Sequence, residues 1–191
     1  MGTSTTDGSV LAHLMAGSAH GLRNHVATLR SVVQLQDDPE VAEALAAATR
    51  AVQVTVERAV ALARIELGAS TTTEVIDLGE LVSLALRRAR REGVELEEVT
   101  HTFDAGAVVV PGTVAERLFT DLVHYAGATP AISANVQGNE VDIAFALHAG
   151  GPPVGVGAVL HVLARACGGT LHLVEDEALL TLPLAPVVSA E

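Results

Sequence analysis

Five residues, Gln36-Asp37-Asp38-Pro39-Glu40, divide one long helical pattern into two and so decide the fold of the first third of the chain. Asp38 is suited to cap a helix N-terminus, and Pro39 fits the first helical position. Before this break, apolar residues recur at helical spacing: Leu11, Met15, Leu22, Val26, Leu29 and Val33. A second series follows it and ends before Gly68, a suitable C-terminal cap: Val41, Leu45, Ala48, Val52, Val56, Ala59 and Leu62. Two helices of matched length joined by a short turn predict an antiparallel hairpin.

A helical hairpin buries only one face of each helix, so it needs a partner. The simplest partner is a second copy of the chain, which gives a four-helix bundle on a two-fold axis. The alanine-rich residues 42–51 would let such helices approach closely. We therefore expect a homodimer formed through residues 10–67.

The sequence pattern changes after residues 69–73, which predict a linker between two domains, residues 1–72 and 73–191. We expect helices at 77–93 and 113–126, each opened by a capping box, Asp77 to Glu80 and Thr113 to Glu116. A third helix is expected between a Gly/Pro loop at 149–157 and Gly168. Strands are expected at 74–77, 94–103, 107–110, 131–137, 140–147, 171–174 and 178–182, with Gly138-Asn139 as a hairpin turn. Helices and strands that mix without strict alternation predict a layered α+β sandwich.

Composition limits the cellular setting. The 191 residues are 49% apolar, which is enough for a substantial core, but no apolar run approaches the roughly 20 residues of a membrane helix. Residues 1–9 lack the pattern of a signal peptide. Cys167 is the only cysteine, so an internal disulfide is impossible and a reducing environment is favoured. We expect a cytoplasmic protein.

The charge is strongly acidic and unevenly distributed. The formal net charge is -12, which argues against nucleic acid or an anionic membrane as partner. Residues 1–72 carry a net charge of -2, the remainder carries -10, and the chain has no lysine. A polyphosphate ligand would therefore meet an electrostatically unfavourable C-terminal domain.

His20 is the residue most suited to chemistry. It lies off the apolar stripe of the first expected helix, where a partner could reach it, and a neutral imidazole is nucleophilic near pH 7. Arg23 and Asn24 follow within one helical turn and could contact phosphoryl oxygens or the partner. Metal binding by His13, His20 and His25 is disfavoured, because residues seven apart are too distant to share an ion and no acidic partner completes a site. The histidines at 124, 148, 161 and 172 are expected to fill core or surface roles.

The stretch His20-Gly21-Leu22-Arg23-Asn24-His25 resembles the phosphoacceptor motif of sensor histidine kinases, His-Glu-Leu-Arg-Asn/Thr-Pro. The resemblance spans about residues 10–185. It implies a dimerisation and phosphotransfer hairpin followed by a Bergerat-type nucleotide-binding domain. Gly21 replaces the acid that is thought to orient the imidazole or accept its proton during attack on ATP. His25 replaces the proline.

The nucleotide motifs of that family are degenerate here. The stretch 121–128 corresponds to Asn-Leu-Leu-x-Asn-Ala-x-Lys, but Tyr125 replaces the magnesium-binding asparagine and Ala128 replaces the lysine. His148 replaces the adenine-binding aspartate of Asp-x-Gly-x-Gly. Residues 155–157 look like a remnant of the Gly-x-Gly loop, and the four residues before them are too few for an ATP lid. Residues 167–170 resemble His-Gly-Gly-Thr.

This combination resembles the dimeric histidine phosphotransferases whose kinase-like C-terminal domains are degenerate. The resemblance implies that His20 accepts a phosphoryl group from one receiver-domain aspartate and donates it to another, with no cofactor on this chain and Mg²⁺ supplied only by the receiver. The alternative is a non-catalytic, pseudokinase-like dimer that binds and regulates a histidine kinase or response regulator. The loss of an acid at Gly21 argues against an ATP-dependent kinase, whereas the sequence does not separate the first two readings.

Overall fold

The computed structural model describes residues 25–66, 72–97, 99–102, 106–148 and 151–186. The chain divides into two compact units, Met1–Ala69 and Ser70–Glu191. The described helices of both units include none with the length and apolar character needed to cross a membrane.

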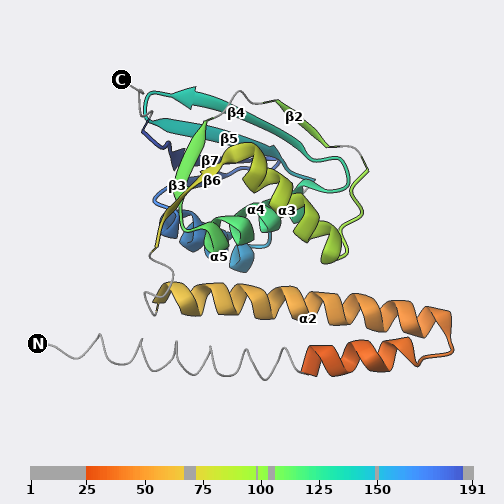
Figure 1. The fold of residues 1–191 in the computed structure, drawn as a ribbon. Coiled ribbons are helices and arrows are strands. Elements are labelled where there is room, and N and C mark those ends of the chain that lie inside the picture. The colour runs from red at the N-terminus through yellow and green to blue at the C-terminus, as the bar shows by residue number, and fades with distance from the viewer. Residues whose placement is uncertain (1–24, 67–71, 98, 103–105, 149–150, 187–191) are drawn as a thin grey trace, which may run out of the picture. The chain divides into compact units, whose positions relative to one another are not determined.

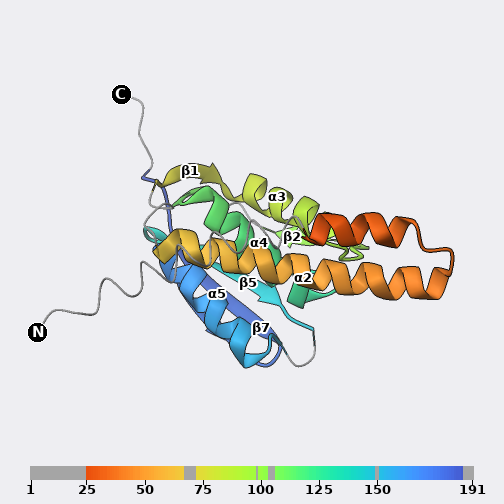
Figure 2. The same ribbon diagram turned by 90° about the horizontal axis from the view of Figure 1, so that it is seen from below.

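The described part of the first unit is a helical hairpin. Residues 25–34 are helical, and α2 (Pro39–Glu66) runs back beside them after a short turn (Figure 2). The Asp38 carboxylate accepts hydrogen bonds from the backbone N–H groups of Glu40 (3.0 Å) and Val41 (3.3 Å), which confirms the predicted N-cap. Local chemistry therefore decides where the second helix begins.

The second unit is built on a five-stranded sheet with the order β2-β4-β5-β7-β6. Its strands are β2 (Thr100–Thr102), β4 (Ala131–Gln137), β5 (Glu140–Ala146), β6 (Thr170–Leu173) and β7 (Glu177–Pro183). Every neighbouring pair is antiparallel except β2 and β4, which run parallel. Three helices cover one face of this sheet: α3 (Leu78–Arg91), α4 (Gly112–Ala126) and α5 (Val154–Ala166) (Figure 1).

A two-stranded sheet completes this unit. Strand β1 (Glu74–Asp77) pairs antiparallel with β3 (Ala107–Val110). Beyond β7, the chain returns to β3 through a bridge between Leu184 and Val108 and a 2.8 Å hydrogen bond from the Ala185 N–H to the Ala107 carbonyl. The residues after β7 therefore join the two sheets.

The core lies between the five-stranded sheet and its helices. Along β5 and β7, alternate side chains are buried on the helical side: Val141, Ile143, Phe145, Ala178, Leu180 and Leu182. The ring of Phe119, from α4, meets Phe145 edge-on with the ring centroids 5.6 Å apart. One sheet face packed under helices is the α+β sandwich that the sequence predicts.

Apart from ends of β5, β6 and β7 that differ by one residue, three predictions were wrong. Helix α4 begins at Gly112 and has Pro111 as its N-cap, so Thr113 lies inside the first turn. Residues 94–97 are not a strand: the Glu97 N–H donates instead to the Ala128 carbonyl at 2.9 Å, and pairing begins only at Thr100. Helix α5 begins at Val154, so residues 155–157 are helical and not a loop.

The glycine at the fourth position of α5 explains that last difference. Gly157 is buried, and a Cβ atom there would lie 3.3 Å from Cδ1 of Leu173 on β6. The glycine thus permits close packing of helix against strand, whereas the sequence pattern had predicted a loop at this position.

Candidate functional site

The predicted phosphoacceptor site lies outside the described residues. His20, Arg23, Asn24 and His13 all precede residue 25, where the described chain begins. His25 is described and exposed, at the start of the first helical segment. The described part of the first helical segment therefore begins five residues after His20 in the sequence.

A small groove lies between the two described helical segments of the hairpin. It encloses about 300 Å³ and is lined by Val26, Ala27, Arg30, Gln53, Val56 and Glu57. Val26 and Val56 form a buried apolar floor, and the Arg30 guanidinium donates a hydrogen bond to the Gln53 side chain across the groove. The hairpin also leaves five large apolar side chains exposed: Leu29, Val32, Leu35, Val41 and Val52.

In the second unit, α4 carries most of the stretch 121–128, which resembles the kinase magnesium-binding motif. Asp121 is fully buried and forms an ion pair with Arg117, one turn earlier on the same helix. Tyr125 is half-buried near the end of α4, and Ala128 is exposed beyond it. The single acid on this stretch is thus already engaged by a protein cation.

His148, which replaces the adenine-binding aspartate, lies against the end of α4. Its backbone N–H donates to the Tyr125 carbonyl at 2.7 Å. Gly127 has a φ of 79°, and a Cβ atom there would lie 3.6 Å from the His148 side chain. A 3.1 Å hydrogen bond from the Gly151 N–H to the His148 carbonyl then turns the chain toward α5. The end of β5 therefore packs directly on the end of α4.

These residues do not fit a magnesium-bound nucleotide. Asp121 is held by Arg117, Tyr125 and His148 lack the carboxylate or carboxamide that the resemblance requires, and Ala128 offers no cation. Within the residues that the structure describes, no group of three His, Cys, Asp or Glu side chains could hold a metal ion.

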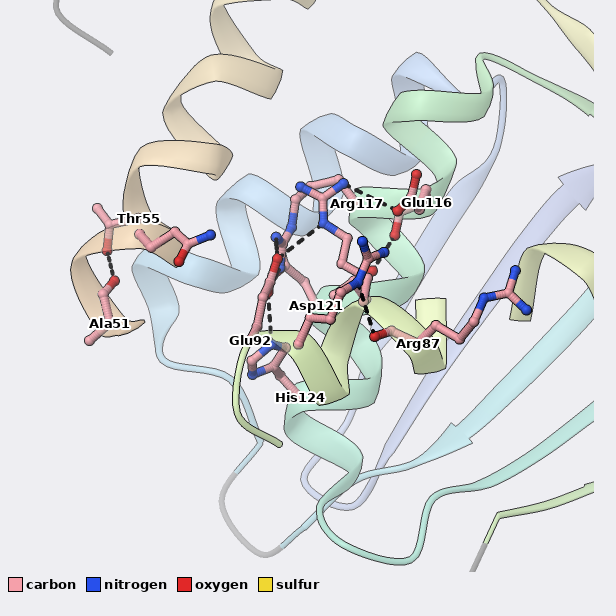
Figure 3. Close-up of polar contacts among 12 residues, drawn as sticks. Ala51, Thr55, Arg87, Glu92, Glu116, Arg117, Asp121 and His124 are labelled. Atoms are coloured by element: carbon pink, nitrogen blue, oxygen red, sulfur yellow. Dashed lines mark hydrogen bonds and ion pairs between the residues drawn. The ribbon is translucent and has the colours of Figure 1, made fainter. Parts of the chain in front are cut away.

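A buried ionic cluster joins the end of α3 to α4 (Figure 3). The Glu92 carboxylate, at the C-cap of α3, is its centre. Its Oε1 accepts from Arg88 Nε (3.0 Å) and Arg117 Nη1 (2.7 Å), and its Oε2 accepts from Arg117 Nη2 (3.1 Å). His124 Nε2 also lies 3.0 Å from Oε2. Arg88 additionally pairs with Glu116 at 3.3 Å.

In this cluster, ion pairing and hydrogen bonding affect the pKa values of Glu92 and Arg117 more than burial does. Burial alone would raise the pKa of Glu92, but the hydrogen bonds from His124, Arg117 and Arg88 and the charge of Arg117 lower it from 4.5 to about 2. Burial would likewise lower the pKa of Arg117, but Asp121 and Glu92 raise it above its ordinary value. Both groups therefore remain charged at neutral pH.

The indication of this cluster in the sequence is weak: α4 carries three charged residues, Glu116, Arg117 and Asp121, among mostly apolar ones. Arg117 lies among buried residues of α4 and is itself only 2% exposed, so it requires buried acidic partners. One partner, Asp121, is a turn away, but Glu92 lies 25 residues earlier. His124, for which only a core or surface role was expected, belongs to the cluster.

Comparison with protein families finds none that matches the chain. No curated protein matches it either. Among solved structures, the chain is similar to the histidine kinase AdeS from Acinetobacter baumannii, with a TM-score of 0.56 and 17% sequence identity over 87% of this chain and 97% of that one. The chain has a histidine-kinase-like fold.

Two other solved structures are less similar to the chain. The ATP binding domain of PrrB from Mycobacterium tuberculosis gives a TM-score of 0.47 and 20% identity over 60% of this chain and 98% of that one. The histidine kinase ThkA in complex with the response regulator protein TrrA gives a TM-score of 0.47 and 15% identity over 95% of this chain and 64% of that one.

Proposed function

We propose that the chain is a histidine phosphotransferase of a two-component phosphorelay. The observation that carries this proposal is a histidine-kinase-like fold in which the nucleotide positions are occupied by unsuitable residues. Asp121 is neutralised by Arg117, and His148 packs against Gly127 at the end of α4. A protein with a kinase-like fold but without nucleotide-binding residues would transfer phosphoryl groups between other proteins and would not take them from ATP.

His20 is the proposed phosphoacceptor, with Arg23 and Asn24 as supporting residues. A ring nitrogen of His20 attacks the phosphorus of an aspartyl phosphate on the receiver domain. An N–P bond forms, the acyl P–O bond breaks, and the receiver carboxylate leaves. The receiver supplies Mg²⁺ and its acidic pocket, and this chain supplies the imidazole and a docking surface. Positioning then accounts for most of the catalysis.

The proposed homodimer forms through the hairpin. Leu29, Leu35 and Val52 are 42%, 82% and 42% exposed in the single chain, a large apolar exposure for one pair of helices. Packing against a second hairpin would cover these side chains in a four-helix bundle. A dimer would also present two copies of His20.

The test is transfer of phosphate from a phosphorylated receiver domain. The full chain is incubated with receivers that carry labelled aspartyl phosphate, and acid-labile label on this chain is measured. We expect label on the unmodified chain and none on His20→Gln. The matched control is His25→Gln, which alters an exposed histidine five residues later in the sequence and should still accept phosphate.

The same experiment decides between relay and scaffold. If receivers bind the unmodified chain and His20→Gln equally well but label neither, the chain is a non-catalytic regulator. Label that persists on His20→Gln would place the phosphoacceptor at another histidine. Calorimetry with Mg-ATP is the companion measurement, and we expect it to show no binding. A micromolar dissociation constant would instead support an ATP-dependent histidine kinase.

A further inference from the structure

The second unit contains a histidine whose ring is held by a carboxylate, in a position that the relay chemistry at His20 does not use. His124 lies in the last turn of α4, and its side chain is 20% exposed. Its Nε2 lies 3.0 Å from Oε2 of Glu92. The side chain makes no other hydrogen bond within the part of the chain that the structure describes.

The carboxylate fixes which ring nitrogen of His124 carries the proton. Glu92 is ionised at neutral pH, since its pKa is lowered to about 2, and an ionised carboxylate can only accept. The hydrogen bond therefore requires Nε2 to be the donor. In the neutral ring, the lone pair is then on Nδ1, the nitrogen that can act as a nucleophile.

Glu92 is itself held rigidly, so it can serve as a positioning residue. Each of its oxygens accepts two hydrogen bonds, from two arginines and from His124. Arg117 is buried, and Arg88 is also paired with Glu116. The carboxylate consequently has one orientation, and it imposes one orientation on the imidazole.

The surroundings stabilise the charged ring that forms when His124 attacks an electrophile. Positive charge develops on the ring as Nδ1 attacks, and both Glu92 and the C-terminal end of α4 stabilise that charge. The second domain is acidic as a whole, but four of its six arginines lie in the last turns of α3: Arg87, Arg88, Arg90 and Arg91. Arg88 contacts Glu92 directly, and the other three are exposed, so this end of α3 is locally positive.

We propose that His124 is a second phosphoryl acceptor, reacting through Nδ1 with acyl phosphates and phosphoramidates and oriented by Glu92. An Nδ1–P bond forms while the P–O bond to the acyl group, or the P–N bond of phosphoramidate, breaks. Acetate or ammonia leaves with the electron pair. The proton on Nε2 remains hydrogen-bonded to Glu92 throughout. This site belongs to the second unit alone and does not depend on phosphotransfer at His20.

The test uses the full chain with His20→Gln, so that label at the two positions cannot be confused. The protein is treated with phosphoramidate, and the modified residue and ring nitrogen are identified by peptide mapping and by ³¹P–¹⁵N correlation. We expect Nδ1-phosphohistidine at His124. Adding His124→Gln should abolish this signal. Adding His172→Gln, which alters an exposed histidine on β6, should leave it unchanged.

The role of Glu92 needs a measurement that a merely structural residue would not affect. Glu92→Gln should slow labelling of His124 about tenfold, the equivalent of one charge-assisted hydrogen bond, and should yield a mixture of Nδ1 and Nε2 isomers. If this variant fails to fold, the ¹⁵N shifts of His124 in the unsubstituted chain decide. Protonation at Nδ1 in the neutral ring, label on Nε2, or labelling of His124 no faster than of His172 would overturn the proposal.

Discussion

Arg117 is the residue on which the junction of α3 and α4 depends most, because it neutralises two buried carboxylates. Replacing it by leucine would retain apolar volume but leave Glu92 and Asp121 without their main cation. We expect Arg117→Leu to lower the free energy of unfolding by about 3–5 kcal/mol. Urea denaturation followed by circular dichroism measures this change.

The control for that substitution is Arg87→Leu, on the exposed side of α3. Its effect should stay within about 0.5 kcal/mol, as at other surface positions. Equal losses in the two variants would mean that the buried cluster adds nothing specific to the stability of the second unit.

Glu92 should make the stability of the protein depend on acid. Its pKa is about 2 when folded and 4.5 as the ordinary value, so the folded state binds the proton less readily. The contribution of Glu92 is therefore fully present above pH 4.5 and is lost as the pH falls toward 2. We expect the free energy of unfolding to decline over this range, and Glu92→Gln to decline less steeply. Parallel slopes for the two proteins would contradict this assignment.

Residue-scale features could be predicted from the sequence where they are local. Asp38 and Asp77 cap their helices as predicted, because an N-cap contacts backbone groups only two or three residues away. The bond between Glu92 and Arg117 could not be predicted in this way. This bond depends on which turns of α3 and α4 lie side by side, and the packing of the two helices on the sheet determines that arrangement. For the same reason, only a core or surface role was predicted for His124.

At the scale of elements, we expect alanine substitution to have opposite effects on stability at two glycines near the ends of α5. A Cβ atom at Gly169, just before β6, would collide with the Thr181 carbonyl oxygen of β7, whereas a Cβ atom at Gly155, in the first turn of α5, would meet no atom within 4 Å. We expect Gly169→Ala to destabilise the protein by about 2 kcal/mol and Gly155→Ala to stabilise it by about 0.5 kcal/mol. Thermal unfolding compares the two, and a stabilising Gly169→Ala would show that β6 and β7 can separate there.

Most elements of the second unit follow from sequence pattern. The predicted bounds of β1, β3 and β4 are confirmed, since alternating side chains and the Gly138-Asn139 turn mark them locally. The predicted strand at 94–103 shrank to three residues because a strand needs a partner as well as a pattern. The start of α5 was missed because glycine signals a loop as readily as it signals close packing.

At the scale of the whole molecule, the proposed dimer predicts that charge on the hairpin is disruptive. We expect Leu29→Glu and Val52→Glu to weaken self-association by at least about 100-fold, because each would bury an unpaired carboxylate in the bundle. Sedimentation equilibrium measures this. Val162→Glu is the control, since Val162 is 38% exposed on α5, in the other unit. A stable monomer of the unmodified chain would contradict the dimer.

The strand order has a consequence for synthesis on the ribosome. Of the described strands, β7 is the last to be made, yet it lies between β5 and β6 and pairs with β5 over residues 177–183 and with β6 over residues 178–181. Until residues 177–183 have left the exit tunnel, β6 has no neighbour among the described strands of the sheet and β5 pairs with β4 alone. The nascent second unit must therefore wait, and it closes in one late step after its final strand emerges.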